Sequence, residues 1–493
     1  MGPFLLTHRI AGTKHLFDIS SKLYPLSIRD QMIRGFLLIE EAIAADLIGP
    51  TKPLLVIGAG AAGATAALLA AQRGVPTTLL EKSDEPFTRQ FNCDTRIVSP
   101  TVYDWPADHW VNTKFPWTGV SFPLEWHEDF AGAIATAWRS RLKLEARRRD
   151  RIKIKFLRTL ADAENFKTVS PSPTDGLIEV HLKMPRDEVV PDKDWDTNPA
   201  AWKIDPESPQ RFAVIISCIG LGRERSSVGE NGYRGLDFWA PDKLSHSDFG
   251  VHGTHHPNIL ISGGGDGALQ DFLRIVTVHD SPREIMAALP DRVKEALALG
   301  IKTAEDQAVR SFIWNTTRYD CRSQYKLHKS YQAVVKRIIG EEYQSVSVAL
   351  AEMIRAVPRV ATVRLVHPCQ HFSPCYALNR ALVLLIAEYV RLEHNVDLIT
   401  PFTSVTDVVS LDGHVCDVNI KECRESSHRV TFELARCEDM SNAGRGSGDG
   451  PHTPPFDVIV IRHGIKFPPY LFGASPDSNS RHLLPYYIDA DWY

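Results

Sequence analysis

One stretch, residues 54–83, constrains the fold of this chain more than any other. It reads LLVIGAGAAGATAALLAAQRGVPTTLLEKS. In order, it contains a short apolar run, three glycines at the G-x-G-x-x-G spacing, an alanine- and leucine-rich helical pattern, a second apolar run and an acidic residue. A strand, a glycine turn, a helix, a strand and an acid in this register predict a βαβ unit that binds a dinucleotide.

Each glycine of this motif has a predicted role. Gly58 permits the tight turn, Gly60 lets a pyrophosphate approach the backbone, and Gly63 lets the helix pack closely on the strand. The helix N-terminus offers unpaired N–H groups to the phosphates, and Glu81 is placed to accept hydrogen bonds from the ribose hydroxyls. The residues predicted to bind this first dinucleotide are Gly58, Gly60, Ala61, Ala62, Gly63, Glu81, Lys82 and Arg96.

A second glycine motif lies in the middle of the chain, in NILISGGGDGALQDFLR at residues 258–274. An apolar strand leads to Gly263, Gly265 and Ala268 at the G-x-G-x-x-A spacing, and a helical pattern follows. Close backbone approach and a helix N-terminus again predict a pyrophosphate site.

Composition restricts the classes of function. The chain has 493 residues, a formal net charge of -4 and eight cysteines, which predicts two or three domains and no nucleic-acid partner. No apolar run approaches the roughly 20 residues of a membrane-spanning helix, and the first residues do not resemble a secretory signal. Scattered cysteines without C-x-x-C pairs indicate reduced thiols and a cytoplasmic location.

The order of motifs resembles flavoproteins with two dinucleotide-binding domains, namely thioredoxin-reductase-like enzymes and flavin-containing monooxygenases. AVIISCIG at 213–220 stands where those families have a strand of the type DAVIIATG, and GGGDGA at 263–268 is similar to their NADPH-binding stretch. FWAPDKLSHSDF at 238–249 loosely resembles a monooxygenase segment. The resemblance implies FAD at the first motif and NAD(P)H at the second.

The role of Asp266 stays open between two readings. In one reading, Asp266 belongs to the second glycine motif and binds the nicotinamide nucleotide. In the other, it ends a Gly-Asp segment of the kind that in this superfamily holds the ribityl chain of the flavin. Three departures from the family also matter. No arginine pair follows the strand ending at His367, no C-x-x-C is present, and no Gly-Asp flavin segment follows the second domain. NADPH preference and disulfide reduction are therefore not predicted.

Four further patterns each have a functional and a structural interpretation. Tyr103 or Trp105 flanks a flavin ring or packs in an aromatic loop, and Cys369 with Cys375 forms a redox pair or two separate thiols. A strand-end Arg-His-Gly at 462–464 copies the phosphohistidine motif of histidine phosphatases, or it only ends the last strand of the second dinucleotide domain. The remaining pattern is a histidine-rich loop with His246, His252, His255 and His256, which is a metal site or a polar loop.

We therefore expect an α/β fold: an FAD-binding Rossmann-like domain and a second NAD(P)-type Rossmann-like domain with a helical insertion. The expected segments are a helical lead-in at 1–50, an FAD-binding domain at 51–257, an NAD(P)-type domain at 258–280 and 359–470, the helical insertion at 281–358, and a tail at 471–493.

The expected function is an FAD-dependent oxidoreductase, with an NAD(P)H-using monooxygenase on a small molecule as its most specific form. The alternatives are an FAD-only oxidase or dehydrogenase, and a nucleotide-binding sensor or scaffold without catalysis. No residue stands out as a catalytic acid or base, and no metal is expected. The helical insertion is the candidate surface for a protein partner or for self-association.

Overall fold

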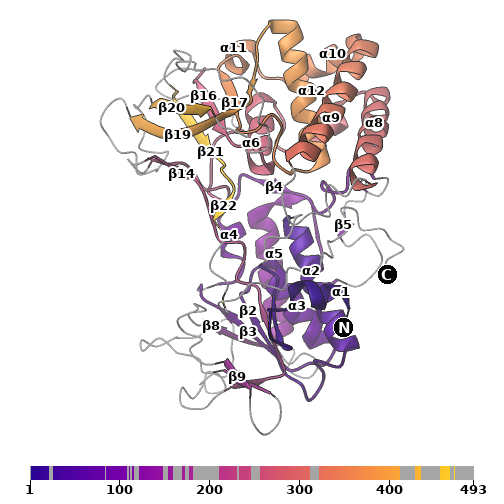
Figure 1. The fold of residues 1–493 in the computed structure, drawn as a ribbon, viewed down its shortest axis with the longest axis vertical. Helices are drawn as coiled ribbons and strands as arrows, with labels where there is room; N and C mark the ends of the chain where they lie inside the picture. The colour runs from indigo at the N-terminus through magenta and orange to yellow at the C-terminus, as the bar shows by residue number, and fades with distance from the viewer. Residues whose placement is uncertain are drawn as a thin grey trace. The chain divides into compact units, whose positions relative to one another are not determined.

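The computed structural model divides the chain into two compact units (Figure 1). The first contains Met1–Asp94, Asn112–Arg223 and Phe467–Tyr493, and the second contains Thr95–Val111 and Glu224–Lys466. The structure describes residues 2–20, 26–83, 85–107, 110, 114–115, 122–147, 154–158, 169–171, 177–180, 210–229, 233–245, 256–310, 321–410, 428–434, 456–466 and 471. Residues 441–455, whose glycine- and serine-rich composition predicts a flexible linker, lie outside these residues. Three of the four clustered histidines also lie outside them.

A five-stranded sheet in the order β1-β12-β2-β3-β8 forms the centre of the first unit. Each neighbouring pair is parallel. The described strands of this unit are β1 (Leu16–Asp18), β2 (Leu54–Ile57), β3 (Thr77–Glu81), β5 (Lys114–Phe115), β6 (Trp126–His127), β7 (Asp129–Phe130), β8 (Ile154–Arg158), β9 (Val169–Pro171), β10 (Ile178–Val180), β11 (Gln210–Phe212) and β12 (Val214–Ser217). Every residue of β2 and of β12 is buried, as expected for central parallel strands.

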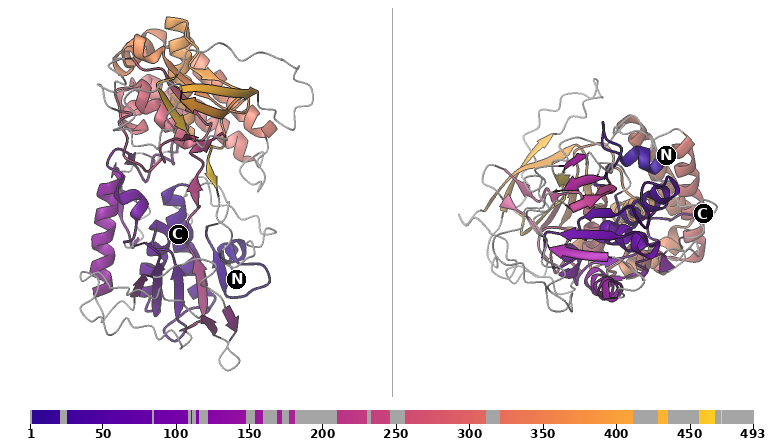
Figure 2. Two further views of the ribbon diagram at one scale, coloured as in Figure 1. Left: turned by 90° about the vertical axis from the view of Figure 1, so that its left-hand side faces the viewer. Right: turned by 90° about the horizontal axis from the view of Figure 1, so that it is seen from below.

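The described helices of the first unit are α1 (Pro3–His8), α2 (Ile28–Ala44), α3 (Ala61–Gln72), α4 (Thr88–Phe91) and α5 (Ala131–Arg147). Helix α2 packs along α3, while α5 packs against β8. Figure 2 shows the ribbon from two further sides, coloured along the chain. At Gly35 the two helices approach so closely that an added Cβ would lie 2.8 Å from the carbonyl oxygen of Ala62. The glycine of α2 is therefore what permits this contact.

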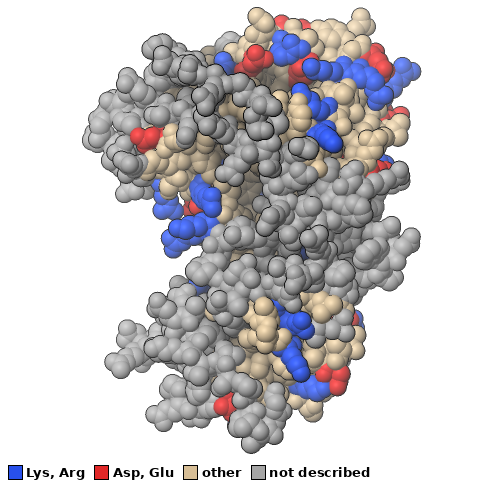
Figure 3. Space-filling view, viewed as in Figure 1, with Lys and Arg blue, Asp and Glu red and all other residues tan. Residues whose placement is uncertain are grey.

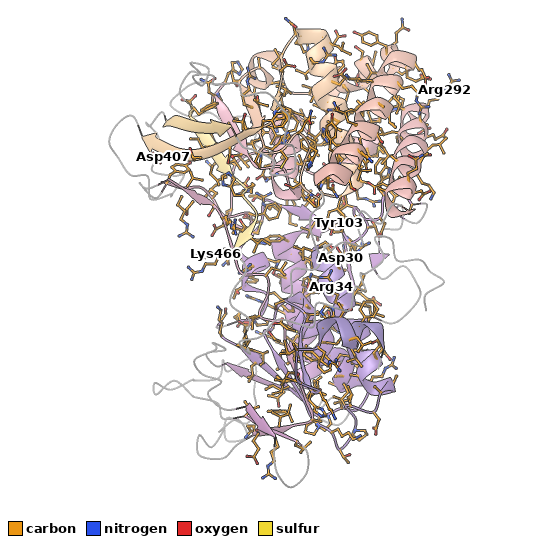
Figure 4. All side chains as sticks on the ribbon, in the orientation of Figure 1. Asp30, Arg34, Tyr103, Arg292, Asp407 and Lys466 are labelled. Carbon is orange, nitrogen blue, oxygen red and sulfur yellow. The ribbon has the colours of Figure 1, made fainter. Side chains whose placement is uncertain are left out.

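Helix α2 begins at a capping box. The Ser27 hydroxyl accepts a hydrogen bond from the backbone N–H of Asp30, and the Asp30 carboxylate accepts one from the backbone N–H of Ser27. Figure 4 shows Asp30 and Arg34 on this helix. Such a box satisfies two otherwise unpaired backbone donors and fixes where the helix begins.

A four-stranded parallel sheet in the order β18-β17-β16-β21 forms the centre of the second unit. The described strands there are β4 (Ile97–Val98), β14 (Ser227–Val228), β15 (Tyr233–Arg234), β16 (Ile259–Ser262), β17 (Val363–Val366), β18 (Ile399–Thr400), β19 (Thr403–Ser410), β20 (His428–Leu434), β21 (Val458–Ile461) and β22 (Ile465–Lys466), and β13 (Arg223–Glu224) spans the boundary. Strands β19 and β20 form an antiparallel pair whose register shifts between Val405 and Asp407; Figure 4 labels Asp407.

Helices lie between β16 and β17 in the sequence. They are α6 (Asp266–Val276), α7 (Pro282–Ala288), α8 (Asp291–Arg310), α9 (Cys321–Glu341), α10 (Tyr343–Met353) and α11 (Val357–Val360), and α12 (Ala377–His394) follows β17. The predicted α/β fold, with two parallel-sheet units and a helical insertion in the second, is confirmed. Among the described residues, no helix combines the length and the apolar character that crossing a membrane requires.

Candidate functional site

The first glycine motif joins β2 to α3 by a turn that tolerates no larger residue at two positions. Gly58 has a φ of +102°, and a Cβ there would lie 2.4 Å from the carbonyl oxygen of Cys218. A Cβ at Gly63 would lie 1.9 Å from the carbonyl oxygen of Gly58. These two glycines are required by the close packing of the turn, β12 and α3.

Gly60 differs from the other two glycines because its surroundings are open. It is the N-cap of α3, with a φ of −73° and no side-chain cap, and a Cβ added there would meet no atom within 4 Å. The first turn of α3 contains Ala61 and Ala62, which are both half-buried. An uncapped helix N-terminus beside open space is the arrangement that accepts a phosphate.

Glu81 ends β3 and reaches back to the glycine turn. Its Oε2 accepts a 2.6 Å hydrogen bond from the backbone N–H of Ala59, and its Oε1 accepts a 2.8 Å hydrogen bond from the backbone N–H of Ser83. Each carboxylate oxygen retains a second lone pair. The carboxylate is thus oriented beside the turn and can accept further hydrogen bonds, whereas Lys82 is exposed.

Asp18 is a residue of this site that sequence reasoning missed. Strand β1 pairs in parallel with β12, so Asp18 lies at the same carboxyl edge of the sheet as the glycine turn. Its Oδ1 accepts a 2.7 Å hydrogen bond from the N–H of Ser20, and its Oδ2 is buried without a hydrogen-bond partner in the described part of the chain. Burial raises the pKa of Asp18 to about 6.

The segment after β12 meets the segment after β1. The backbone N–H of Gly220, which has a φ of +82°, donates a 3.1 Å hydrogen bond to the hydroxyl of Ser20. In parallel α/β sheets, ligands bind outside the carboxyl ends of the strands where the strand order reverses. Here the order reverses between β2 and β12, so Gly58, Gly220 and Asp18 border the place where a dinucleotide is expected.

The second glycine motif repeats the construction of the first. Gly263 follows β16 with a φ of +147°, and a Cβ there would lie 2.3 Å from the carbonyl oxygen of Arg462, just after β21. Gly265 is the N-cap of α6 and has open space around it, like Gly60. Ala268 is buried in α6. This edge of the second sheet therefore also offers an uncapped helix N-terminus.

Asp266 is engaged within the second unit. Its Oδ1 accepts hydrogen bonds from the backbone N–H of Tyr376 at 3.0 Å and from Nδ2 of Asn379 at 2.8 Å. The carboxylate therefore fastens the beginning of α12 to the glycine turn. The two ligand roles that the sequence left open for Asp266 both stay predictions.

Arg96, expected beside a pyrophosphate, belongs to the second unit and is 2% exposed. Its guanidinium lies 2.7 Å from the Asp271 carboxylate and 3.3 Å from that of Asp242. Arg274 and Arg462 contact the same Asp271 side chain. The guanidinium of Arg96 is thus held in a buried ion-pair cluster, and its contact with a pyrophosphate stays a prediction.

The remaining patterns from the sequence lie in packed surroundings. Tyr103 packs against Tyr376, with ring centroids 4.3 Å apart, and Figure 4 labels Tyr103. Cys375 is a free thiol, and burial raises its pKa to about 12. His463 of the Arg-His-Gly stretch lies 2.7 Å from the Ser262 hydroxyl. No group of three metal-ligating side chains occurs within the described ranges.

The helices at 282–353 carry mixed charges and isolated exposed apolar side chains. On the described atoms of the face in Figure 3, positive and negative residues are interspersed over this region. Leu299 of α8 is 70% exposed and Val348 of α10 is 64% exposed. A protein partner or self-association at this surface stays a prediction.

A profile of the family described as "NAD(P)-binding Rossmann-like domain" matches residues 56–118. This match begins in β2 and includes α3, β3 and Glu81, so it agrees with the first glycine motif as a dinucleotide-binding unit. A search of curated proteins found no match.

Several solved structures match most of the chain at low sequence identity. Lactococcus lactis thioredoxin reductase (FR conformation) is 10% identical, covers 84% of this chain and 78% of its own, and has a TM-score of 0.35. OTEMO in complex with FAD and NADP is 12% identical, with 85% and 71% coverage and a TM-score of 0.34. Cyclohexanone monooxygenase in an open structure is 13% identical, with 84% and 74% coverage and a TM-score of 0.35.

Proposed function

We propose that this protein is an FAD-dependent oxidoreductase that binds FAD in the first unit and a nicotinamide nucleotide in the second. The most specific form of the proposal is a monooxygenase acting on a small molecule. The proposal rests on one observation, that the same glycine turn, here called a cradle, occurs in both units. Gly58 and Gly263 each lie against the backbone that follows a neighbouring strand. Gly60 and Gly265 each have open space around them and begin a helix, α3 and α6.

In the first unit, the residues present fit a dinucleotide along the carboxyl edge of the sheet. The N–H groups at Ala61 and Ala62 would hold the pyrophosphate beside Gly60. Glu81 would accept hydrogen bonds from ribose hydroxyls with the lone pairs that Ala59 and Ser83 leave available. The amides that orient this carboxylate also keep it from rotating away, which lowers the entropic cost of binding.

Asp18 and Ser20 would border the far part of the ligand. Because the pKa of Asp18 is about 6, its carboxyl is ionised at neutral pH although it is buried, and its Oδ2 has capacity for a hydrogen-bond donor from a ligand. Such a donor would compensate for the loss of solvation. Bound FAD supplies two-electron redox chemistry, while these residues supply binding and orientation.

A second candidate, an FAD-only oxidase or dehydrogenase, is favoured by one observation at the second cradle. The loop after β17 packs over Gly264, so that a Cβ there would lie 3.2 Å from the Cβ of His367 and 3.2 Å from the backbone nitrogen of Ser373. The Ser373 N–H donates to the carbonyl oxygen of Gly264. A nicotinamide nucleotide at this motif must fit beside this loop.

Cofactor loading and anaerobic reduction test the proposal. The purified chain, reconstituted with FAD, should show absorbance near ~450 nm and should bleach when NADH or NADPH is added without oxygen. FAD binding without reduction by either nucleotide would favour the FAD-only enzyme. A chain that binds nucleotide but cannot be loaded with FAD would overturn the proposal in favour of a sensor or scaffold.

A further inference from the structure

The helical part of the second unit contains a buried guanidinium that has no ion-pair partner among the described residues. Arg380 of α12 is 0% exposed. Its Nε contacts Cys375 Sγ at 3.4 Å and its Nη2 donates to the Gln324 amide oxygen at 3.2 Å, while Nη1 is buried with no partner in the described part of the chain. None of these contacts is with a carboxylate. Arginine is almost never fully buried unless it is paired.

An aromatic ring connects Arg380 to a buried carboxylate. The Arg380 guanidinium lies over Tyr331, 5.1 Å from the ring centroid, and the Tyr331 hydroxyl donates to the Glu305 carboxylate on α8. Tyr331 therefore stands between the two charges. The Nη1 hydrogens, which are strong donors, do not take part in this arrangement.

His328 of α9 supplies a second unpartnered donor near Arg380. Its Nε2 lies 3.2 Å from Nε2 of Gln332, and an amide nitrogen can only donate, so Nε2 of the neutral ring accepts and Nδ1 carries the proton. Nδ1 is buried with no partner among the described residues. Burial and then the charge of Arg380 lower the pKa of His328 to about 2, so the ring is neutral. The ring lies on the face of α9 that contacts Arg380, because Gln324 one turn before it and Tyr331 one turn after it both contact that guanidinium.

Buried polar atoms without partners are rare in folded proteins, and each requires an explanation. Here a charged donor from α12 and a neutral donor from α9 lie in one buried region. Gln324 already accepts from Nη2, and Gln332 donates to His328. The buried Glu305 carboxylate is near enough to raise the pKa of Arg380, but it makes no hydrogen bond with Nη1. The missing partner must therefore be an acceptor, and a negatively charged acceptor fits a guanidinium best.

We propose that Arg380 and His328 bind a small oxyanion, a carboxylate or phosphate group, between α9 and α12. The oxyanion accepts hydrogen bonds from Nη1 of Arg380 and Nδ1 of His328 and neutralises the buried charge. This site lies within the second unit and does not depend on FAD. It would give the helical insertion a ligand-binding role, for an acidic small molecule or for free phosphate.

The experiment measures anion binding to the full-length chain by thermal denaturation and calorimetry. Inorganic phosphate and acetate are compared with chloride at equal ionic strength. Phosphate or acetate should raise the Tm with saturation, because a ligand that binds only the folded state stabilises it. The anion with the larger saturating shift identifies the source as a phosphate or a carboxylate. Shifts equal to that of chloride would overturn the proposal.

Variants test the two donors separately. Arg380→Gln and His328→Leu should abolish the shift, whereas His328→Asn, which retains a donor near the Nδ1 position, should keep it. Arg380→Lys should weaken binding by about tenfold, since a charge-assisted hydrogen bond is lost. Arg391→Gln, on an exposed face of the same helix, is the matched control and should bind normally. If Arg380→Gln does not fold, equal binding by His328→Leu and His328→Asn would still overturn the proposal.

Discussion

Asp18 lies directly opposite Ser217 in a parallel pair, although 199 positions separate them in the sequence. This pairing places β1 beside β12 and brings a buried carboxyl to the edge that carries the first glycine motif. Helix α2 then packs along α3, the helix whose N-terminus forms the cradle. Residues 1–50, expected as a helical lead-in, thus contribute a strand and a helix to the candidate cofactor site.

The carboxyl of Asp18 predicts a pH-dependent stability. Its pKa is about 6 in the folded chain against 3.8 without burial, so between these values the folded chain binds a proton that the unfolded chain has released. The stabilisation from this proton is complete below about pH 4 and is lost as the pH rises through about 6. Asp18→Asn cannot ionise. Above that pH range, its free energy of unfolding should therefore exceed that of the FAD-free wild type by on the order of 2–3 kcal/mol.

Urea denaturation at about pH 4 and about pH 8 measures this difference. The comparison of the two variants at each pH cancels the opposite contribution of His8, whose pKa is lowered to about 3 by burial and by the charge of Arg34. The same stability difference at both pH values would show that the folded chain does not hold a proton on Asp18.

The local part of the site could be predicted from the sequence, whereas the distant part could not. Glycine spacing and apolar periodicity are short-range signals, and they located both βαβ motifs. Strand β1 has only three residues, which is too short for a hydrophobic period to indicate a strand. Its partner β12 is far along the chain, so the sequence did not predict that Asp18 lies at this edge. The ion-pair partners of Arg96 are equally invisible to short-range signals, because Asp242 and Asp271 are 146 and 175 residues away.

Gly60 predicts a variant that folds but does not bind cofactor. Because its φ is ordinary and its surroundings are open, Gly60→Val should keep the fold while the new side chain fills the place of the pyrophosphate. FAD affinity, measured by fluorescence titration, should fall by at least about 100-fold, roughly 3 kcal/mol. Gly340→Ala, an exposed helical glycine with equally open space, is the control. Unchanged FAD affinity in Gly60→Val would remove the first cradle from the proposal.

Asp271 predicts a strong structural effect in the second unit. Burial alone would raise its pKa, but the charges of Arg96, Arg462 and Arg274 hold it at about 2. Asp271→Ala would leave three buried guanidinium groups without this carboxylate and should cost about 3–5 kcal/mol. Denaturation monitored by circular dichroism measures the loss. Asp291→Ala, an exposed aspartate in α8, should change stability little, and an equal effect of both substitutions would contradict the cluster's role.

The stability that Asp271 contributes should also depend on pH in the opposite sense to that of Asp18. Its folded pKa of about 2 lies below the ordinary value of 3.8, so the contribution is complete above about pH 4 and is lost as the pH falls towards about 2. The gap between wild type and Asp271→Asn should therefore shrink on acidification. A gap that is constant from neutral pH to about pH 2 would show that the carboxylate is not held ionised by the three arginines.

Substitution of Asp266 distinguishes the two readings that the sequence left open. In the structure its carboxylate accepts hydrogen bonds from Tyr376 and Asn379 at the start of α12. Asp266→Ala should therefore lower stability by about 1–3 kcal/mol and weaken nicotinamide-nucleotide binding at the neighbouring Gly265, while FAD affinity stays unchanged. Parallel titrations with FAD and NADH separate these effects, and Asp266→Asn, which keeps an acceptor oxygen, should recover most of the stability. Loss of FAD binding in Asp266→Ala would instead assign this residue to the flavin, because the rest of the first cradle is intact in that variant.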